Sequence, residues 1–306
     1  MKTVLVLLAY TAAFDAVDHD TLLDILRVSF GISGAVLDWI ESFLSGRVQV
    51  VRVGSLLSEP VALQFGVPQG SVLVPPLYII YTADIIQVFE RHGFKVHLYA
   101  DDSQLYIHLE LVNVRAILHS TEDCLHEVKQ WSSSRRLLLN AGKTEFMIMD
   151  RSGQVQLTPD EFSIQFGEAT IKMTDIARSL GVMMDSRLTM KPFISRTTRS
   201  CFYHLRRIRQ IRSCLSDSCA KTITVALVLS RVDYCSSVLV GLPSTSLKPL
   251  SSALCTAARV VTSSSSRCHV THLLRELHWL PIQARIHYKL CLMMFNIRSG
   301  KAPEST

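Results

Sequence analysis

Residues 99–106 of the chain read YADDSQLY, and the two adjacent carboxylates in this stretch decide how the rest of the sequence is interpreted. Asp101 and Asp102 lie between two apolar segments, FKVHL and LYIHL, a pattern typical of a β-hairpin with the acidic pair at its tip. Adjacent like charges in an apolar hairpin are unfavourable unless a cation or solvent offsets them. The stretch therefore predicts either a cation site or a solvated acidic turn.

The composition is that of a globular protein without a strong overall charge. Of the 306 residues, 48% are hydrophobic and 19% are charged, and the formal net charge is +6. A chain of this length is expected to form one large or two medium domains with a buried core. Because the net charge is only mildly basic, any site for a polyanion has to come from local clustering of Lys and Arg.

The N-terminal stretch has two interpretations. Residues 1–17 have the basic residue, short apolar run and small residues of a signal peptide, but residues 4–9 also have the Val and Leu content of a buried strand. We favour the strand because the apolar run is short. The eight cysteines form no C-x-x-C pair and are typical of intracellular thiols. The expected location is the cytoplasm or nucleus, without secretion and without a transmembrane helix.

The pattern along the chain predicts a β-rich half followed by a helical half, and therefore an α+β fold in two parts. No internal repeat is visible. The expected elements are two helices within 20–46 (the first capped by Asp20, the two separated at Gly31), two short strands within 47–64 joined at Gly54 and Ser55, a helix from about Pro76 to Arg91, the acidic hairpin, a helix over 121–138, a turn and a strand within 140–149, two short strands within 176–185, and helices from about 190 onward with a break at Ser263–Ser266.

Five motifs occur in an informative order: AAFD (12–15), GVPQGSVL (66–73), YADD (99–102), NAGKTEF (140–146) and SLGV (179–182). In this order the chain resembles the palm and thumb of reverse transcriptases, most closely those of LINE-type (non-LTR) retrotransposons. Residues 230–243 and 274–289 look like the C-terminal part of such reading frames. The resemblance implies a right-hand polymerase palm, an antiparallel sheet with packed helices and partial fingers, over 1–185. A mostly helical thumb and C-terminal region is implied over 186–306.

The resemblance also implies RNA-directed DNA synthesis, in which a primer 3′-OH attacks a deoxynucleoside triphosphate. Two divalent ions about 4 Å apart stabilise the attacking and leaving oxygens of such a displacement. Mg²⁺ (or Mn²⁺) suits the carboxylate and phosphate oxygens, and Asp101 and Asp102 are the implied catalytic and metal-binding residues. The implied partners are an RNA template, a DNA primer and deoxynucleoside triphosphates; no membrane partner is expected, and the oligomeric state is left open.

One carboxylate that the resemblance requires is missing. The first motif strand of the family reads roughly LLDLSAAFD, and its first Asp binds both metals; here the stretch VLLAYTAAFD aligns Ala9 with that Asp. Phe14 matches the aromatic residue that packs under the sugar and excludes a 2′-OH. Asp15 and Asp18 lie too far downstream to replace the lost ligand. The loss predicts a fall in rate on the order of 10³ or more, because a bridging ligand contributes several kcal/mol.

Three further residues are implied contacts of the nucleotide. Gln69 and Gly70 keep their places in the loop that, in the family, lies against the incoming nucleotide and the template base, and Lys143 matches a lysine near the triphosphate. An ordinary loop amide and a solvated turn lysine are the alternatives for Gln69 and Lys143. Val74 replaces a family glycine, whose missing Cβ allows unusual backbone angles, and is a second departure expected to impair the site.

Residues 187–212 form a basic segment with seven arginines, one lysine and no acid. On a helix, Ile194, Cys201 and Ile208 share one face with Thr197 and Leu205. This arrangement leaves the arginines for phosphate contacts, which give affinity without reading sequence. A solvated basic helix face is the alternative. The residues expected to bind nucleic acid are Arg196, Arg199, Arg206 and Arg207.

Two functions follow from these features. The first is a reverse transcriptase domain impaired by Ala9; the second is a non-catalytic, nucleic-acid-binding relic of a retroelement. The fingers segments and the endonuclease domain that precede the AAFD strand in the family have no counterpart here, so we expect a truncated copy of the C-terminal part of such a reading frame. A secreted protein is a third interpretation, which rests on the N-terminal run.

Overall fold

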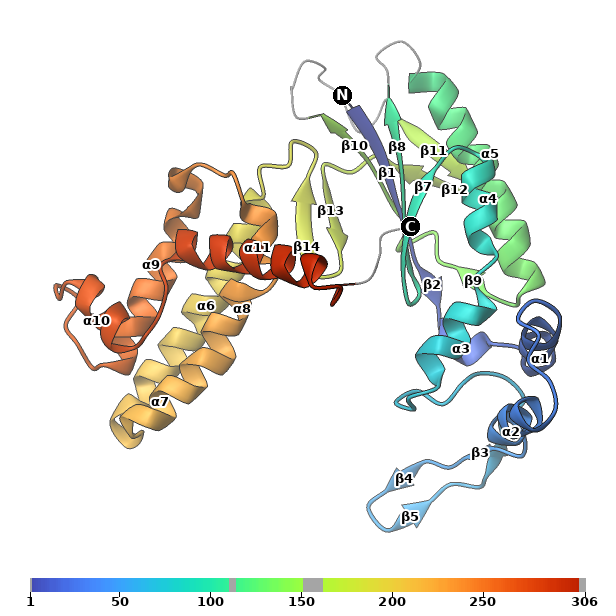
Figure 1. Cartoon of the computed structure of the whole chain (residues 1–306), viewed down its shortest axis with the longest axis horizontal. Helices are drawn as coiled ribbons and strands as arrows, with labels where there is room; N and C mark the ends of the chain where they lie inside the picture. The colour runs from blue at the N-terminus through green and yellow to red at the C-terminus, as the bar shows by residue number, and fades with distance from the viewer. Residues whose placement is uncertain (1, 110–113, 151–161, 303–306) are drawn as a thin grey trace. The chain divides into compact units, whose positions relative to one another are not determined.

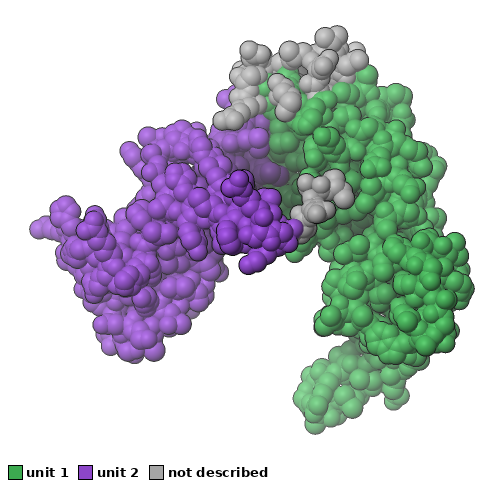
Figure 2. All heavy atoms as spheres, in the orientation of Figure 1, with its two compact units in different colours: residues 1–180 green, residues 181–306 purple. Residues whose placement is uncertain are grey.

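The computed structural model describes residues 2–109, 114–150 and 162–302 of the chain. These residues divide into two compact units, unit 1 (residues 1–180) and unit 2 (residues 181–306), which Figure 2 shows in green and purple. The division falls at residue 180, close to the boundary expected at 185. The assignment of the two units as palm and thumb stays a prediction.

Unit 1 is built on a four-stranded antiparallel sheet in the order β10–β1–β8–β7 (Figure 1). β1 (Lys2–Leu8) lies between β10 and β8, and its Val and Leu side chains are buried whichever way they point. A strand covered on both faces has such a continuous apolar run, so the predicted N-terminal strand is confirmed with slightly different ends. The other strands are β7 (Lys95–Tyr99), β8 (Asp102–Leu109) and β10 (Glu145–Asp150).

Two helices and a hairpin cover one face of this sheet. Val4, Val6 and Leu8 of β1 pack there in one apolar cluster with residues of α4 and α5. α5 is the amphipathic helix predicted over 121–138, but it lies over Val114–Ser134. The covering elements are α4 (Ile85–Arg91), α5, β11 (Ser163–Phe166) and β12 (Ala169–Lys172).

The prediction of a single helix from Pro76 to Arg91 is wrong. The chain forms α3 (Val74–Tyr81) and α4 with a turn between them. The Thr82 side chain donates to the Tyr78 carbonyl at 3.0 Å beside the end of α3. The interruption lets the two helices contribute to different apolar clusters. Tyr78 packs with α1 (His19–Val28) and α2 (Ala35–Leu44), whereas α4 packs on the sheet.

The first helix begins two residues earlier than expected. Asp18, and not Asp20, is the N-cap of α1, because its Oδ1 accepts from the Thr21 backbone N–H at 2.9 Å and from the Thr21 hydroxyl at 2.8 Å.

The strands predicted within 47–64 form a hairpin that turns at Gly54, which has φ 64°. The remaining short elements of unit 1 are β2 (Tyr10–Thr11), η1 (Ala13–Ala16), β3 (Val48–Gln49), β4 (Arg52–Val53), β5 (Leu56–Leu57), β6 (Val61–Ala62), β9 (Leu138–Leu139) and β13 (Ile176–Ser179).

Unit 2 is mostly helical, as the pattern after residue 190 predicts. α6 and α9 pack against each other and supply much of its apolar core. The break expected at Ser263–Ser266 is confirmed, because α9 ends at Val261 and α10 begins at Val270. Its elements are β14 (Val182–Asp185), α6 (Lys191–Ile211), η2 (Arg212–Cys214), α7 (Asp217–Thr224), the π-helical η3 (Val225–Leu229), α8 (Ser230–Asp233), η4 (Ser236–Leu239), α9 (Ser244–Val261), α10 (Val270–Glu276) and α11 (Ile282–Arg298).

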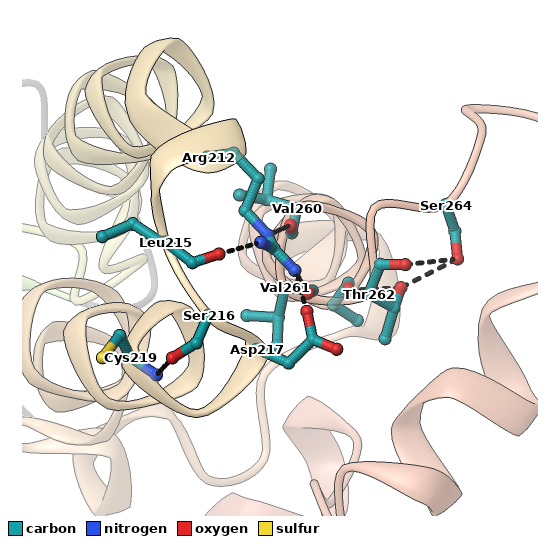
Figure 3. Close-up of polar contacts among 10 residues, drawn as sticks. Arg212, Leu215, Ser216, Asp217, Cys219, Val260, Val261, Thr262 and Ser264 are labelled. Atoms are coloured by element: carbon teal, nitrogen blue, oxygen red, sulfur yellow. Dashed lines mark hydrogen bonds and ion pairs between the residues drawn. The ribbon is translucent and has the colours of Figure 1, made fainter.

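Arg212 joins the ends of two helices in unit 2 (Figure 3). It lies just after α6, and its guanidinium donates to the carbonyls of Val260 at 3.0 Å and Val261 at 2.7 Å, the last residues of α9. The same group donates to the Leu215 carbonyl at 2.8 Å and pairs with Asp217. Because the last carbonyls of a helix lack partners within the helix and carry partial negative charge, this one side chain caps α9 and fixes the turn into α7.

Arg212→Ala is therefore expected to lower the free energy of unfolding of unit 2 by about 3 kcal/mol, since several carbonyls lose a charged donor in a mostly buried setting. Chemical denaturation followed by circular dichroism measures this change. Arg209→Ala is the matched control, because Arg209 is an exposed arginine on the last turn of α6, and it should change stability by no more than about 0.5 kcal/mol. Equal effects of the two substitutions would contradict this role of Arg212.

In the described parts of the chain, no helix combines the length and the apolar character that crossing a membrane requires.

Candidate functional sites

The acidic pair lies at the tip of the β7–β8 hairpin, as the sequence predicts. Tyr99 pairs with Asp102, so Ala100 and Asp101 form a two-residue turn between the strands. Ala100 has φ 53°, in the left-handed region that such tight turns require. Asp102 is exposed and Asp101 is partly buried. The two carboxylates are therefore held at one end of the sheet, where solvent and solutes reach them.

The register of the sheet places Ala9 beside this tip. Leu8, the last residue of β1, pairs with Ser103 of β8. One further step of the same antiparallel register sets Ala9 opposite Asp102. Residues that lie directly opposite project from the same face of a sheet, with Cβ atoms about 4.5–5.5 Å apart. A carboxylate at position 9 would therefore lie close to the acidic pair, and the chain has a methyl group there.

A turn from a distant part of the sequence adjoins Ala9. The backbone N–H of Asn140 donates to the Ala9 carbonyl at 2.9 Å, and the Asn140 side chain donates to the Thr11 hydroxyl at 3.1 Å. Lys143 lies in the same turn, where its backbone N–H donates to the Asn140 side chain at 3.1 Å, and its side chain is exposed. The Lys143 backbone is thus held near Ala9 and the acidic tip, and its role toward a nucleotide stays a prediction.

Burial and charge at the tip act on two ionisable groups. Partial burial, and then the neighbouring charge of Asp101, raise the pKa of the Asp102 carboxyl. Burial raises the pKa of Tyr78 much further, with smaller contributions from the charges of Tyr10, Asp101 and Tyr81. The Tyr78 ring also lies 4.6 Å from the Phe14 ring, centroid to centroid. Tyr78 therefore connects Phe14 with the acidic tip, which brings the predicted sugar-contacting residue to the same region.

The loop that contains Gln69 and Gly70 is fixed to the segment around Phe14. The Val67 backbone N–H donates to the Phe14 carbonyl at 2.9 Å, and the Gln69 side chain donates to Asp15 at 3.3 Å. Gly66 has φ 87°, and a Cβ at this position would lie 2.9 Å from the Asp15 Cα, so only glycine fits the close approach. Gly70, with φ 90°, is exposed. Their contact with a nucleotide stays a prediction.

The concern about Val74 is not supported by the backbone. Val74 is the first residue of α3, and it is not among the residues with positive φ. Its side chain is buried among the residues of α1, α2 and α3. Pro75 and Pro76 follow within the first turn of α3, where proline is tolerated because the N–H groups have no partner within the helix. Val74 therefore fits an ordinary helix start without backbone strain, and the expected impairment of the site at this position stays a prediction.

The acidic tip does not supply the donors of a two-metal site. Within residues 2–109, 114–150 and 162–302, no group of three or more His, Cys, Asp or Glu side chains is arranged to hold a metal ion. Asp101 and Asp102 are two carboxylates on one hairpin, and the facing position is Ala9, whose carbonyl already accepts from Asn140. Two ions need shared carboxylates from two strands, so the residues present do not fit a metal pair.

The Tyr78 hydroxyl is buried without a hydrogen-bond partner among the described residues. Tyr78→Phe is therefore expected to leave the free energy of unfolding unchanged or to raise it by up to about 1 kcal/mol, because an unpaired polar group is removed without a cavity. Tyr81→Phe is the matched control: the Tyr81 hydroxyl donates to the Arg135 carbonyl at 2.6 Å, so its loss should lower stability by about 1–2 kcal/mol. Thermal denaturation of both variants provides the comparison, and a clear loss of stability in Tyr78→Phe would show that its hydroxyl has a partner.

In unit 2, α6 presents a basic face to solvent. The four arginines predicted to bind nucleic acid are all exposed, whereas Ile194, Cys201, Leu205 and Ile208 are buried, so the predicted division of the helix is confirmed. Phe202 and Tyr203 are also exposed on this helix, and Arg207 donates to the Tyr203 hydroxyl at 2.7 Å. Cations interleaved with aromatic side chains suit a nucleic-acid backbone with unstacked bases. Binding itself stays a prediction for Arg196, Arg199, Arg206 and Arg207.

Sequence reasoning missed three residues that organise the candidate active site. Asn140 holds the Lys143 turn against Ala9, Asp15 holds Gln69, and Tyr78 links Phe14 with the acidic tip. Asn140 and Asp15 fall inside motifs that the sequence displays, NAGKTEF and AAFD, so their positions were visible although their contacts were not. Tyr78 gave no signal, because one more aromatic residue in an apolar helix is an ordinary core residue.

A family model and the curated relatives that match this chain are all reverse transcriptases. The family model described as reverse transcriptase (RNA-dependent DNA polymerase) matches residues 1–184. The probable RNA-directed DNA polymerase from transposon BS of Drosophila melanogaster is 30% identical over 202 residues, which cover 64% of this chain and 22% of that protein. The RNA-directed DNA polymerase from mobile element jockey of Drosophila funebris is 28% identical over 191 residues, covering 60% of this chain and 20% of that protein.

These alignments extend over only part of the relatives, because the chain spans about a fifth of the length of the curated proteins it matches. Among solved structures, telomerase from Candida albicans, in complex with a fragment of telomeric RNA, aligns with 92% of this chain and 51% of the telomerase chain. The identity is 13% and the TM-score is 0.42. A similarity at this level is too distant to support a statement about residues or ligands.

Proposed function

The chain belongs to the reverse transcriptase (RNA-dependent DNA polymerase) family, and we propose that it is a retrotransposon reverse transcriptase domain that binds a primed RNA template but transfers nucleotides poorly. The observation that carries this proposal is the register between β1 and β8. The register pairs Leu8 with Ser103, and one further step of it would set Ala9 opposite Asp102. Ala9 is the residue that aligns with the metal-bridging Asp of the family strand. The site keeps two acids of one strand hairpin and has no acid on the facing strand.

The acidic tip holds enough charge for one cation and too few ligands for two. Reverse transcriptases generally use divalent metal ions, and Mg²⁺ or Mn²⁺ is the ion that the Asp101 and Asp102 carboxylates would attract. Since the donor set does not fit a metal pair, the charge that develops on the phosphate during transfer is offset incompletely. Partial burial, and then the charge of Asp101, raise the pKa of Asp102, which is the electrostatic cost expected of an acidic pair without a bound cation.

The residues around the tip retain the features of a nucleotide site. Phe14 is partly exposed and packs on the buried ring of Tyr78 near Asp101, and an aromatic side chain held in this way suits a sugar ring. Gln69 and Gly70 lie on a loop fixed to the Phe14 segment, where an amide and an open backbone suit a base and a phosphate. Lys143 contributes a cation for the triphosphate. We assign deoxynucleoside triphosphates to this place on the basis of these features and of the family.

An RNA template paired with a DNA primer is the proposed polyanion, and the basic face of α6 is the proposed place where its backbone binds. The second candidate function, a non-catalytic nucleic-acid-binding module, is favoured by the same face. Arg199 and Arg206 make no hydrogen bond or ion pair with the residues that the structure describes, and α6 contains no acid. Their charge is therefore available for phosphates, whatever the state of the polymerase site.

Two measurements on the natural chain test the proposal together. Filter binding should show an affinity for an RNA–DNA hybrid, and single-nucleotide extension of the same hybrid with Mg²⁺ should show little product. Binding without extension supports the impaired site. Extension at the rate of an intact polymerase would overturn it, and the absence of both would remove the nucleic-acid role as well.

A further inference from the structure

A basic cavity lies at the C-terminal end of α6, in addition to the exposed basic face of that helix. It has a volume of about 380 Å³, and three arginines and three serines are among the residues that line it. Arg209 comes from the last turn of α6, Arg212 follows that helix, and Arg259 comes from the last turn of α9. The serines are Ser263, Ser264 and Ser266, from the turn that follows α9.

The charge of this cavity is not balanced by the protein. No Asp or Glu is among its lining residues. Asp217 pairs with Arg212 and offsets one of the three guanidinium charges. The side chains of Arg209 and Arg259 form no ion pair with the described residues. The wall therefore carries about two uncompensated positive charges, in a recess where they are less screened than on an open surface.

Two of the arginines also have unused donors. Arg259 donates through Nη2 to the Cys268 carbonyl at 3.2 Å, but its Nε is buried and has no partner in the described structure. The Arg209 side chain makes no hydrogen bond there. Arg212, in contrast, already donates hydrogen bonds to the last carbonyls of α9, as Figure 3 shows. A buried N–H without an acceptor is unfavourable, so an anion would satisfy Arg259. The exposed Arg209 lines the same cavity and, in the described structure, has free donors for that anion.

The hydroxyl groups of the turn after α9 also suit an anionic ligand. Ser264 hydrogen bonds with the Thr262 hydroxyl at 2.8 Å, which holds the turn after α9 in place (Figure 3). Ser263 has φ 52°, so the chain reverses sharply there and directs the serine segment toward the arginines that line the cavity with it. Arginine and hydroxyl donors around a concave site are the usual recognition set for phosphate oxygens.

We propose that this cavity binds a phosphate monoester, with Arg209 and Arg259 as the principal ligands. A phosphate monoester carries up to two negative charges at neutral pH and has three oxygens that accept strong hydrogen bonds. The charge matches the uncompensated charge of the wall. The cavity is larger than one phosphate group, so it leaves room for the rest of the ester, and a nucleoside monophosphate is the ester that we test. Its source is the 5′ end of a nucleic-acid strand or a free nucleotide, and the site does not depend on polymerase activity.

Isothermal titration calorimetry of the whole chain with adenosine 5′-monophosphate, a 5′-phosphorylated oligonucleotide and its 5′-hydroxyl form tests the site. Adenosine 5′-monophosphate and the 5′-phosphorylated oligonucleotide should bind. Any binding of the 5′-hydroxyl oligonucleotide should be unchanged by the substitutions below, because that compound has no phosphate monoester. Arg209→Gln and Arg259→Gln should each weaken binding about tenfold or more, since a charged donor is lost. Arg275→Gln, which changes an exposed arginine on α10, is the matched control and should bind like the natural chain. Arg209 is exposed, so its variant keeps the test valid even where Arg259→Gln fails to fold.

The two sources of the phosphate give different results in the same experiment. A 5′-phosphorylated oligonucleotide that binds more tightly than its 5′-hydroxyl form, by a margin that Arg209→Gln and Arg259→Gln remove, identifies the strand end. Equal affinities of the two oligonucleotides, together with binding of the mononucleotide, identify a free nucleotide. Either result supports a phosphate monoester site. No binding of any phosphorylated compound, or equal binding by the natural chain and both arginine variants, would overturn the proposal.

Discussion

Ala9→Asp is expected to raise Mg²⁺-dependent extension of a DNA primer on an RNA template by about a thousandfold or more over the natural chain. Each 1.36 kcal/mol of transition-state stabilisation changes the rate by about tenfold, and a shared metal ligand contributes several kcal/mol. The register between β1 and β8 directs the new carboxylate to the side of the sheet that Asp102 faces. The substitution therefore completes an acidic set to which two neighbouring strands contribute.

Two controls separate this gain from other causes. Ala9→Asn has nearly the same shape without the charge, and it should extend the primer no better than the natural chain. Asp101→Ala in the Ala9→Asp background should remove the gain, because the new carboxylate then has no complete set to join. A gain that persists without Asp101 would show that synthesis takes place elsewhere. Equal extension by the natural chain and by Ala9→Asp would show that position 9 does not limit the reaction.

The second large effect concerns the basic face of α6. We expect the affinity of the chain for an RNA–DNA hybrid to fall about 100-fold between 50 and 200 mM salt, because about four phosphate contacts release about that number of counterions. The expected contacts are Arg196, Arg199, Arg206 and Arg207, all of which are exposed on α6. Filter binding over a series of salt concentrations measures the slope directly.

The double variant Arg199→Gln and Arg206→Gln should lower that slope by about two, since two phosphate contacts are lost. These two arginines have no protein partner in the described structure, whereas Arg207 is held by Tyr203, so the effect of their removal is not masked by rearrangement. Arg275→Gln on α10 removes one positive charge away from α6 and should leave the slope unchanged. A slope that does not depend on salt, or an equal change in the control, would assign the binding to another surface.

Much of the fold follows from patterns in the sequence. The continuous Val and Leu run of β1, the alternation around the acidic pair and the helical spacing in α6 each gave the correct element. In these segments the local propensity agrees with the tertiary environment. The predicted cap at Asp20 was wrong because two acids stand close together, and only the Thr21 contact selects Asp18. The division between α3 and α4 also escaped prediction, because it depends on which apolar cluster each helix joins.

The candidate active site was predictable in its residues and less so in its contacts. The placement of Ala9 beside Asp102 follows from strand order and register, which an ordered set of motifs indicates well. The hydrogen bonds of Asn140 and Asp15 depend on turns that bring distant segments together. The burial of Tyr78 beside Asp101 is a packing result. Patterns in a single sequence carry little information on these hydrogen bonds or on this burial, because side-chain direction and loop path are fixed only when the whole core assembles.

Electron paramagnetic resonance of bound Mn²⁺ tests the central claim most directly, because two ions bridged by a shared carboxylate interact magnetically and single ions do not. The samples are the natural chain and Ala9→Asp, each with an RNA–DNA hybrid and a non-hydrolysable deoxynucleoside triphosphate. We expect a coupled pair of ions in Ala9→Asp and only uncoupled Mn²⁺ in the natural chain. A coupled pair in the natural chain would contradict the account, because it would show that Asp101 and Asp102 assemble the metal site without a carboxylate at position 9.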